Sequence, residues 1–175
     1  MKIASSRNLK RAVGPALAAG LLVTPLATPA AAQTPGSTAF RLFGSAYLSA
    51  RAGAHNQMSA SVSGGRLILS DTSGVALGPG CVRVSATSAD CGAVATVGGI
   101  SIGMGDLNDS FQSNLALRTL VDAGTGTDTV ATGGGNDTIG VSDGAPGDTV
   151  TCDGGADTVF RDVGDSIAAD CERRF

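Results

Sequence analysis

The chain has 175 residues, with 15 acidic side chains against 12 basic ones and a formal charge of −3 at pH 7. Aromatic residues make up 3% of the sequence, tryptophan is absent and glycine occurs 26 times. This composition excludes a thick core of large side chains, and the negative charge excludes nucleic-acid binding by phosphate neutralisation.

Residues 1–32 are predicted to be a secretory signal peptide. Basic residues come first, an apolar stretch follows over 12–26, and Ala30-Ala31-Ala32 fits a small-residue cleavage site. The alternative is a retained membrane anchor, but the apolar stretch falls short of the about 20 residues needed to span a bilayer. Cleavage leaves residues 33–175, in which eight arginines oppose fifteen acids for a net charge of −7. We therefore expect a secreted, extracellular protein with no membrane span.

Residues 33–100 are predicted to form a small β region, because regularly placed apolar residues favour a folded chain over a disordered one. The segment 40–48 is either an opening strand or an apolar cap. Residues 56–71 indicate a hairpin around a Gly64-Gly65 turn, with Val62 opposite Leu67 and Ala60 opposite Leu69. A short strand over 81–84 and a further strand over 94–102 follow, and no helix is expected after the signal peptide.

The four cysteines fall into two local pairs, Cys81/Cys91 and Cys152/Cys171. In an exported chain an even count favours disulfides, and we expect each local pair to bond. Neither pair has C-x-x-C spacing, and His55 is the single histidine. A zinc site is therefore not expected.

A short repeat dominates the second half of the chain. An acidic residue, a Ser or Thr and a large apolar residue recur in seven rows, one of which has Arg in the acidic position. The steps between rows are 9, 10, 9, 11, 9 and 8 residues. Glycines precede most rows, as in Gly133-Gly134-Gly135-Asn136-Asp137. The rows begin at Asp109, Arg118, Asp128, Asp137, Asp148, Asp157 and Asp165.

This pattern resembles the hemolysin-type (RTX) calcium-binding nonapeptide, G-G-x-G-x-D-x-U-x, over residues 103–167. The segment 150–172 is similar to the closing segment of secreted actinobacterial calcium-binding repeat proteins, in which two cysteines tie the last coil to the tail. The resemblance implies an all-β fold in which the small β region leads into a right-handed parallel β-roll over 101–175. It also implies Ca²⁺ between stacked turns, with ligands from Asp109, Asp128, Asp137, Asp148 and Asp157 and from the turns of Gly124, Gly126, Gly133, Gly135, Gly154 and Gly155.

Rows two apart should stack in such a roll. One stack would hold Asp109, Asp128, Asp148 and Asp165, and the other Arg118, Asp137 and Asp157. The Asp137/Asp157 site keeps most glycines, whereas Pro146 replaces a motif glycine between Asp128 and Asp148. Arg118 should abolish ligation by its own turn, and Asp165 should cap the roll. We expect about two to four ions, against the alternative of a metal-free solenoid with solvated aspartates.

Catalysis is not expected. Gly99-Ile100-Ser101-Ile102-Gly103 matches the hydrolase motif G-x-S-x-G, but that motif needs a following helix and a later histidine, and His55 precedes it. The sequence predicts a non-enzymatic, secreted calcium-binding protein. The rival hypothesis is an adhesin or carrier, in which residues 33–100 bind an unknown protein or surface partner and calcium only stabilises the scaffold.

Overall fold

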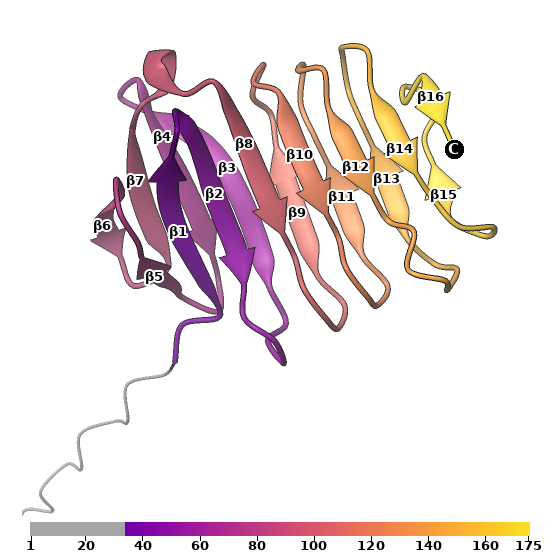
Figure 1. Cartoon of the computed structure of the whole chain (residues 1–175), viewed down its shortest axis with the longest axis horizontal. Coiled ribbons are helices and arrows are strands. Elements are labelled where there is room, and N and C mark those ends of the chain that lie inside the picture. The colour runs from indigo at the N-terminus through magenta and orange to yellow at the C-terminus, as the bar shows by residue number, and fades with distance from the viewer. Residues whose placement is uncertain (1–33) are drawn as a thin grey trace, which may run out of the picture. The chain divides into compact units, whose positions relative to one another are not determined.

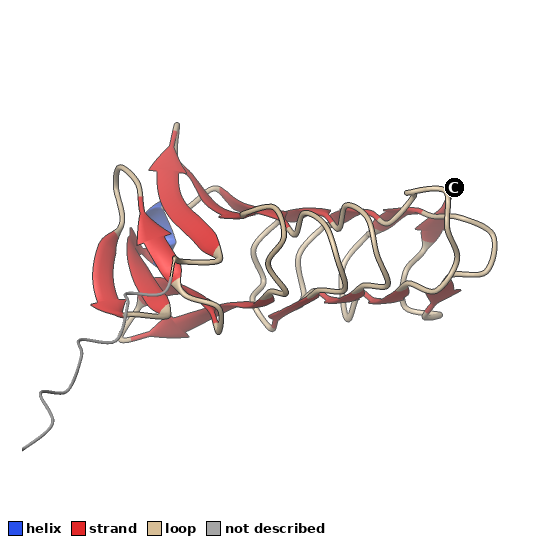
Figure 2. Ribbon diagram, turned by 90° about the horizontal axis from the view of Figure 1, so that it is seen from below, coloured by secondary structure: helices blue, strands red, loops and turns tan. Residues whose placement is uncertain are grey.

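The computed structural model describes residues 34–175, an all-β fold of two mixed eight-stranded sheets (Figures 1 and 2). The predicted signal peptide lies outside the described residues. Within 34–175 no helix is long and apolar enough to cross a membrane. One sheet has the strand order β16-β14-β12-β10-β8-β2-β1-β5, and the other has β15-β13-β11-β9-β3-β4-β7-β6.

The first seven strands pair antiparallel with one another, except that β5 joins β1 in parallel. They are β1 (Ser37–Leu42), β2 (Ser45–Ala50), β3 (Gln57–Ser63), β4 (Arg66–Asp71), β5 (Val75–Leu77), β6 (Val82–Ser85) and β7 (Ser88–Ala93). The open question over residues 40–48 resolves in favour of strands, since β1 and β2 pair as a hairpin. The strand predicted over 81–84 is β6, which begins one residue later.

The predicted hairpin over 56–71 is confirmed in position and register. Ala60 pairs with Leu69 and Val62 with Leu67, and Gly64 and Gly65 both have positive φ, at 56° and 75°. Val62 departs from the expected buried face, because it lies beside the turn and is 43% exposed.

The strand predicted over 94–102 is only half correct. Residues Val94–Thr96 form a 3-10 turn, closed by a bond from the Val97 N–H to the Val94 carbonyl. Strand β8 then covers Gly99–Gly103. The turn is needed because the chain passes here from the sheet of β7 to the sheet of β8.

From β8 onward successive strands alternate between the two sheets (Figure 2). One sheet receives β10 (Thr119–Asp122), β12 (Thr138–Gly140), β14 (Thr158–Phe160) and β16 (Arg173–Arg174). The other receives β9 (Ser110–Ser113), β11 (Thr129–Ala131), β13 (Thr149–Thr151) and β15 (Ser166–Ile167). Neighbouring strands in this part are parallel, so rows two apart stack as predicted. We call two consecutive strands with their turns a coil.

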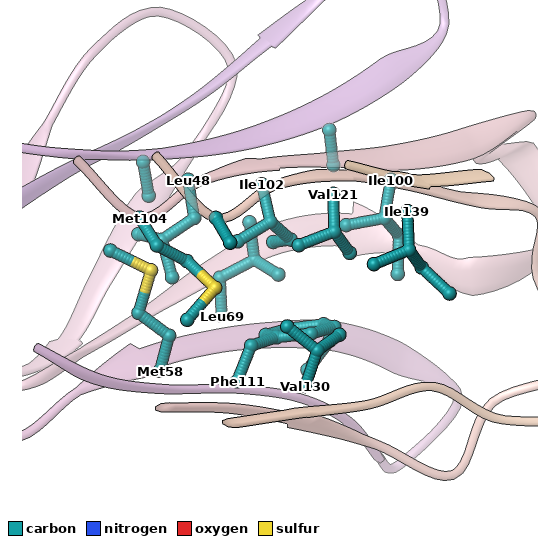
Figure 3. Close-up of a cluster of buried hydrophobic side chains, with 14 of the residues drawn as sticks. Leu48, Met58, Leu69, Ile100, Ile102, Met104, Phe111, Val121, Val130 and Ile139 are labelled. Carbon is teal, nitrogen blue, oxygen red and sulfur yellow. The ribbon is translucent and has the colours of Figure 1, made fainter. Parts of the chain in front are cut away.

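The core is a single layer of side chains between the sheets. Figure 3 shows large apolar residues of one sheet facing those of the other, namely Ile102, Val121 and Ile139 against Met58, Phe111 and Val130. Strands β2 and β3 pair with β8 and β9, so both sheets and the core run without a break through residues 34–175. Most strands in the coils supply one large inward side chain, which suits a chain with few aromatic residues.

The row assigned to Arg118 is wrong by one residue. The register pairs Leu120 with Thr138 and Val121 with Ile139, which puts Thr119 opposite Asp137. Val121 is 1% exposed, whereas Leu120 is 47% exposed. Alternation along the strand therefore turns Val121 inward and Leu120 outward. Thr119, and not Arg118, occupies the acidic position of this row.

Candidate metal centre

Stacked aspartates on one edge of the fold form a ladder of hydrogen bonds, which we call the first ladder. The Asp109 Oδ1 accepts the N–H of Asn56 at 2.7 Å, and each later carboxylate accepts the N–H of the acid before it. The donor–acceptor distances are 2.8 Å from Asp109 to Asp128, 2.7 Å from Asp128 to Asp148 and 3.2 Å from Asp148 to Asp165. The predicted first stack is therefore formed, and Asn56 begins it.

The opposite edge carries a second ladder, made in the same way. The Thr119 N–H donates to the Asp137 Oδ1 at 2.7 Å, and the Asp137 N–H donates to the Asp157 Oδ1 at 2.8 Å. The Asp157 N–H then donates to the Glu172 Oε2 at 2.7 Å. Asp137 and Asp157 stack as predicted. Glu172 was missed, because the tail lacks both the Ser or Thr and the apolar residue of the other rows.

The ladder aspartates are buried, and some of their oxygens have no partner. Asp109, Asp128, Asp137, Asp148 and Asp157 are all at most 5% exposed. In four of them the second carboxylate oxygen, Oδ2, accepts no hydrogen bond. A buried unsatisfied polar atom costs about 1–3 kcal/mol, and more when it is charged. The residues with such an oxygen are Asp109, Asp128, Asp137 and Asp157.

Burial raises the pKa of all five of these aspartates above the ordinary aspartate value. The effect is largest at Asp128, where burial raises the pKa to about 6, partly offset by the hydrogen bond from the Asp109 N–H. The negative charges of Asp148, Asp109 and Asp143 add to the rise. Without a counter-ion the ladders are columns of like charge in a poorly hydrated site.

Carbonyl oxygens of one coil fill the space beside the glycines of the next. A Cβ on Gly155 would lie 1.8 Å from the Gly135 oxygen, and one on Gly124 would lie 1.9 Å from the Gly105 oxygen. A Cβ added at Gly126, Gly133 or Gly135 would likewise lie 1.9–2.5 Å from a carbonyl oxygen. Gly154 has open space instead. The turns thus bring carbonyl and carboxylate oxygens together at the same edges, which is the donor set that Ca²⁺ prefers.

The turn before Asp148 differs from the others. Asp143 lies in this turn, and its Oδ2 accepts the N–H of Gly126 at 3.1 Å. A hydrogen bond from the Ala145 N–H, and with it the one from Gly126, lowers the pKa of Asp143. Asp165 is only half-buried and closes the first ladder, where its Oδ1 accepts the N–H groups of Gly147 and Asp148. Arg118 is exposed and lies outside both ladders.

Both predicted disulfides are present. Cys81–Cys91 joins β7 to the start of β6 with a Cα–Cα distance of 4.2 Å, and Cys152–Cys171 joins two stacked turns at 5.2 Å. Asp170 lies beside the second pair. Both sulfurs are covalently bonded, so no thiolate is free there to bind a metal. Ser101 lies in the middle of β8 and not on a strand-to-helix turn, so the hydrolase motif lacks its required geometry.

No family model, curated protein or solved structure matches this chain. The family named from the repeat is therefore a hypothesis that depends on the residues and their stacking.

Proposed function

We propose that the protein is a secreted calcium-binding protein, in which Ca²⁺ binds between stacked Gly- and Asp-rich turns and stabilises the fold. The observation that carries this proposal is the set of four buried Oδ2 atoms without a hydrogen-bond partner, on Asp109, Asp128, Asp137 and Asp157. A cation bound beside them would neutralise charge that burial otherwise penalises.

The chemistry of the turns favours calcium over other metals. The donors at the ladders are carboxylate and carbonyl oxygens, and the described cysteines are all in disulfides. Oxygen-only sites suit Ca²⁺, Mg²⁺ and Mn²⁺, whereas zinc and copper prefer nitrogen or sulfur. Ca²⁺ accepts six to eight oxygens in flexible geometry, whereas Mg²⁺ demands a near-ideal octahedron and keeps several waters. Irregular turns of differing length therefore suit Ca²⁺ best.

The strand pattern supports the proposal that the coils form an RTX-like β-roll. Parallel strands that alternate between two sheets, with short glycine-rich turns at both edges, are the arrangement expected of an RTX-like right-handed parallel β-roll. In such a roll calcium would couple to folding, because it binds the stacked turns and not the open chain. One site at 100 times its dissociation constant adds about 2.7 kcal/mol of stability. The two disulfides are consistent with an oxidising compartment such as the extracellular space.

Calcium titration of residues 33–175, freed of metal by a chelator, tests the proposal. Calorimetry should report binding, and circular dichroism on the same samples should report a gain of β structure or of thermal stability. Magnesium at the same concentration is the control and should act more weakly. Absence of binding heat, with an unchanged spectrum and melting temperature, would contradict the proposed function.

A second candidate function is adhesion through the N-terminal β region. Val82 and Val84 are each 59% exposed on β6, which lies at the edge of its sheet. Exposed apolar side chains on an edge strand suit an added partner strand. A V84K variant that keeps its calcium response but loses attachment to the cell surface would favour this candidate. If the V84K variant attaches to the cell surface as the wild type does, the edge of β6 is excluded as the binding site for a partner.

A further inference from the structure

The last coil carries an acid in register with the second ladder. Strand β16 pairs in parallel with β14, with Arg173 opposite Thr158, so Glu172 lies opposite Asp157. The 2.7 Å bond from the Asp157 N–H to the Glu172 Oε2 repeats the 2.8 Å bond from Asp137 to Asp157. Glu172 thus takes the aspartate position with a side chain one methylene longer.

Asp157 supplies an independent sign of a ligand at this position. Its side chain is 0% exposed, and its Oδ2 has no hydrogen-bond partner among the described residues. Burial raises the pKa of Asp157, and the charges of Glu172 and Asp170 raise it further. The bond from Asp157 lowers the pKa of Glu172, so Glu172 is charged at neutral pH. A buried, unsatisfied carboxylate therefore faces added negative charge from the tail.

The second disulfide fixes Glu172 in place. Cys171 directly precedes Glu172, and its partner Cys152 begins the turn that ends at Asp157. Asp170 adds two hydrogen bonds between the same turns, as its carboxylate accepts the N–H groups of Cys152 at 3.3 Å and Asp153 at 3.2 Å. The tail is thus held on the turn below it by a disulfide and by several hydrogen bonds, although it has no glycines to stack.

Two arginines donate to carbonyl oxygens at this end of the chain, and the charge of one of them, Arg173, opposes a cation beside Asp157. The Arg173 Nη2 donates to the Ala156 carbonyl at 3.2 Å, and its charge acts against the rise in the pKa of Asp157. Arg174 donates from Nε to the Cys171 carbonyl and from Nη2 to the Ala168 carbonyl, both at 2.9 Å. A site here would have fewer free protein oxygens than one between inner coils, and a positive charge beside it.

We infer that Asp157 and Glu172 form a terminal calcium site, positioned by the Cys152–Cys171 disulfide and weaker than the sites between inner coils. This inference rests on the proposed calcium function, but it concerns residues outside the glycine-rich repeat. Arg173 keeps the terminal site weak, so it should fill last as calcium rises and empty first on chelation.

Calorimetric calcium titration of three variants tests the site. Glu172→Gln should bind one ion fewer than the wild type and lose the weakest step. Arg173→Ser should act in the opposite direction and tighten that step several-fold. Arg83→Ser, which removes an exposed arginine on the edge strand β6, is the control and should change neither stoichiometry nor affinity.

The disulfide is tested in the same way. Cys152→Ala with Cys171→Ala should weaken the weakest step about tenfold or abolish it, whereas Cys81→Ala with Cys91→Ala should leave that step unchanged. If the variant with Cys152→Ala and Cys171→Ala fails to fold, the near-isosteric Glu172→Gln variant alone decides whether the terminal site exists. A wild type that binds calcium and a Glu172→Gln variant with the same stoichiometry and weakest affinity would overturn the terminal site and leave the proposed function standing. A wild type without calcium binding would overturn both.

Discussion

Replacing Asp137 by asparagine should stabilise the fold without calcium and should reduce the stability that calcium adds. In the wild type the Thr119 N–H donates to the Asp137 Oδ1 at 2.7 Å, and asparagine keeps an oxygen that can accept this bond. The substitution removes the negative charge of a side chain that is 1% exposed. Because burial raises the pKa of Asp137, the folded state disfavours the charged form. In chelator the variant should therefore be more stable than the wild type.

The size of the effect follows from the negative charge at the unsatisfied Oδ2 of Asp137, which asparagine replaces with a neutral amide. Removal of this buried charge is worth about 1–3 kcal/mol, and 1 kcal/mol shifts the melting temperature of a domain near 150 residues by about 2–4 °C. We expect a rise of about 2–12 °C in chelator. In saturating calcium the variant lacks a ligand, and loss of one site at 100 times its dissociation constant costs about 2.7 kcal/mol.

Differential scanning calorimetry in chelator and in calcium measures both effects. Asp122→Asn is the matched control, because Asp122 is an exposed carboxylate on β10 that belongs to neither ladder. The control should shift the melting temperature little in either condition. If Asp137→Asn lowers the melting temperature equally in chelator and in calcium, Asp137 is a structural residue and the assignment of the second ladder as a metal site is refuted.

Three further predictions concern the turns, the carboxylates and the register. Gly155→Ala should strongly destabilise the fold in thermal melts, because its Cβ would lie 1.8 Å from the Gly135 oxygen at a φ of 149°, whereas Gly154→Ala, with open space, should be tolerated; equal melting temperatures would contradict the close stacking. In chelator, stability measured by urea unfolding should fall as pH rises from about 4, the ordinary aspartate pKa, to about 6, the pKa of Asp128. The sign follows because the folded state binds more protons than the unfolded state in that window, and a rise in stability there would contradict it. Ile139→Ala should cost about 2–5 kcal/mol in calcium, whereas exposed Leu120→Ala should cost far less, and the reverse order would contradict the observed register.

The parts of the fold that depend on local chemistry could be predicted from the sequence. Gly64-Gly65 supplies the positive φ that a two-residue hairpin turn requires, and the alternation on each side fixes the register of Ala60 with Leu69. The spacing of the aspartate rows also predicts their stacking, because a parallel coil brings every second row together. Both disulfides follow from short separations along the chain.

The ends of the ladders could not be predicted, because neither end follows the repeat. Asn56 lies 53 residues before Asp109 and joins its ladder only through the pairing of β3 with β9. The row around Arg118 was placed one residue early, since Thr119-Leu120 mimics the Thr-apolar pair of the other rows and only the buried Val121 reveals the register. Glu172 lies in a tail without glycines, so the repeat does not point to it. The unsatisfied Oδ2 atoms can be identified only from the structure, because burial and hydrogen bonding depend on the packing of the coils.

Hydrogen exchange of the mature protein with and without calcium tests the central claim most directly. The ladder N–H groups of Asp109, Asp128, Asp137, Asp148 and Asp157 all donate to carboxylates of the next coil. We predict that in chelator the amides of 105–172 exchange much faster than in calcium, while those of the hairpin over 57–71 keep most of their protection. Calcium should then protect both segments. Equal and strong protection of 105–172 in chelator and in calcium would mean a metal-free solenoid and would contradict the account.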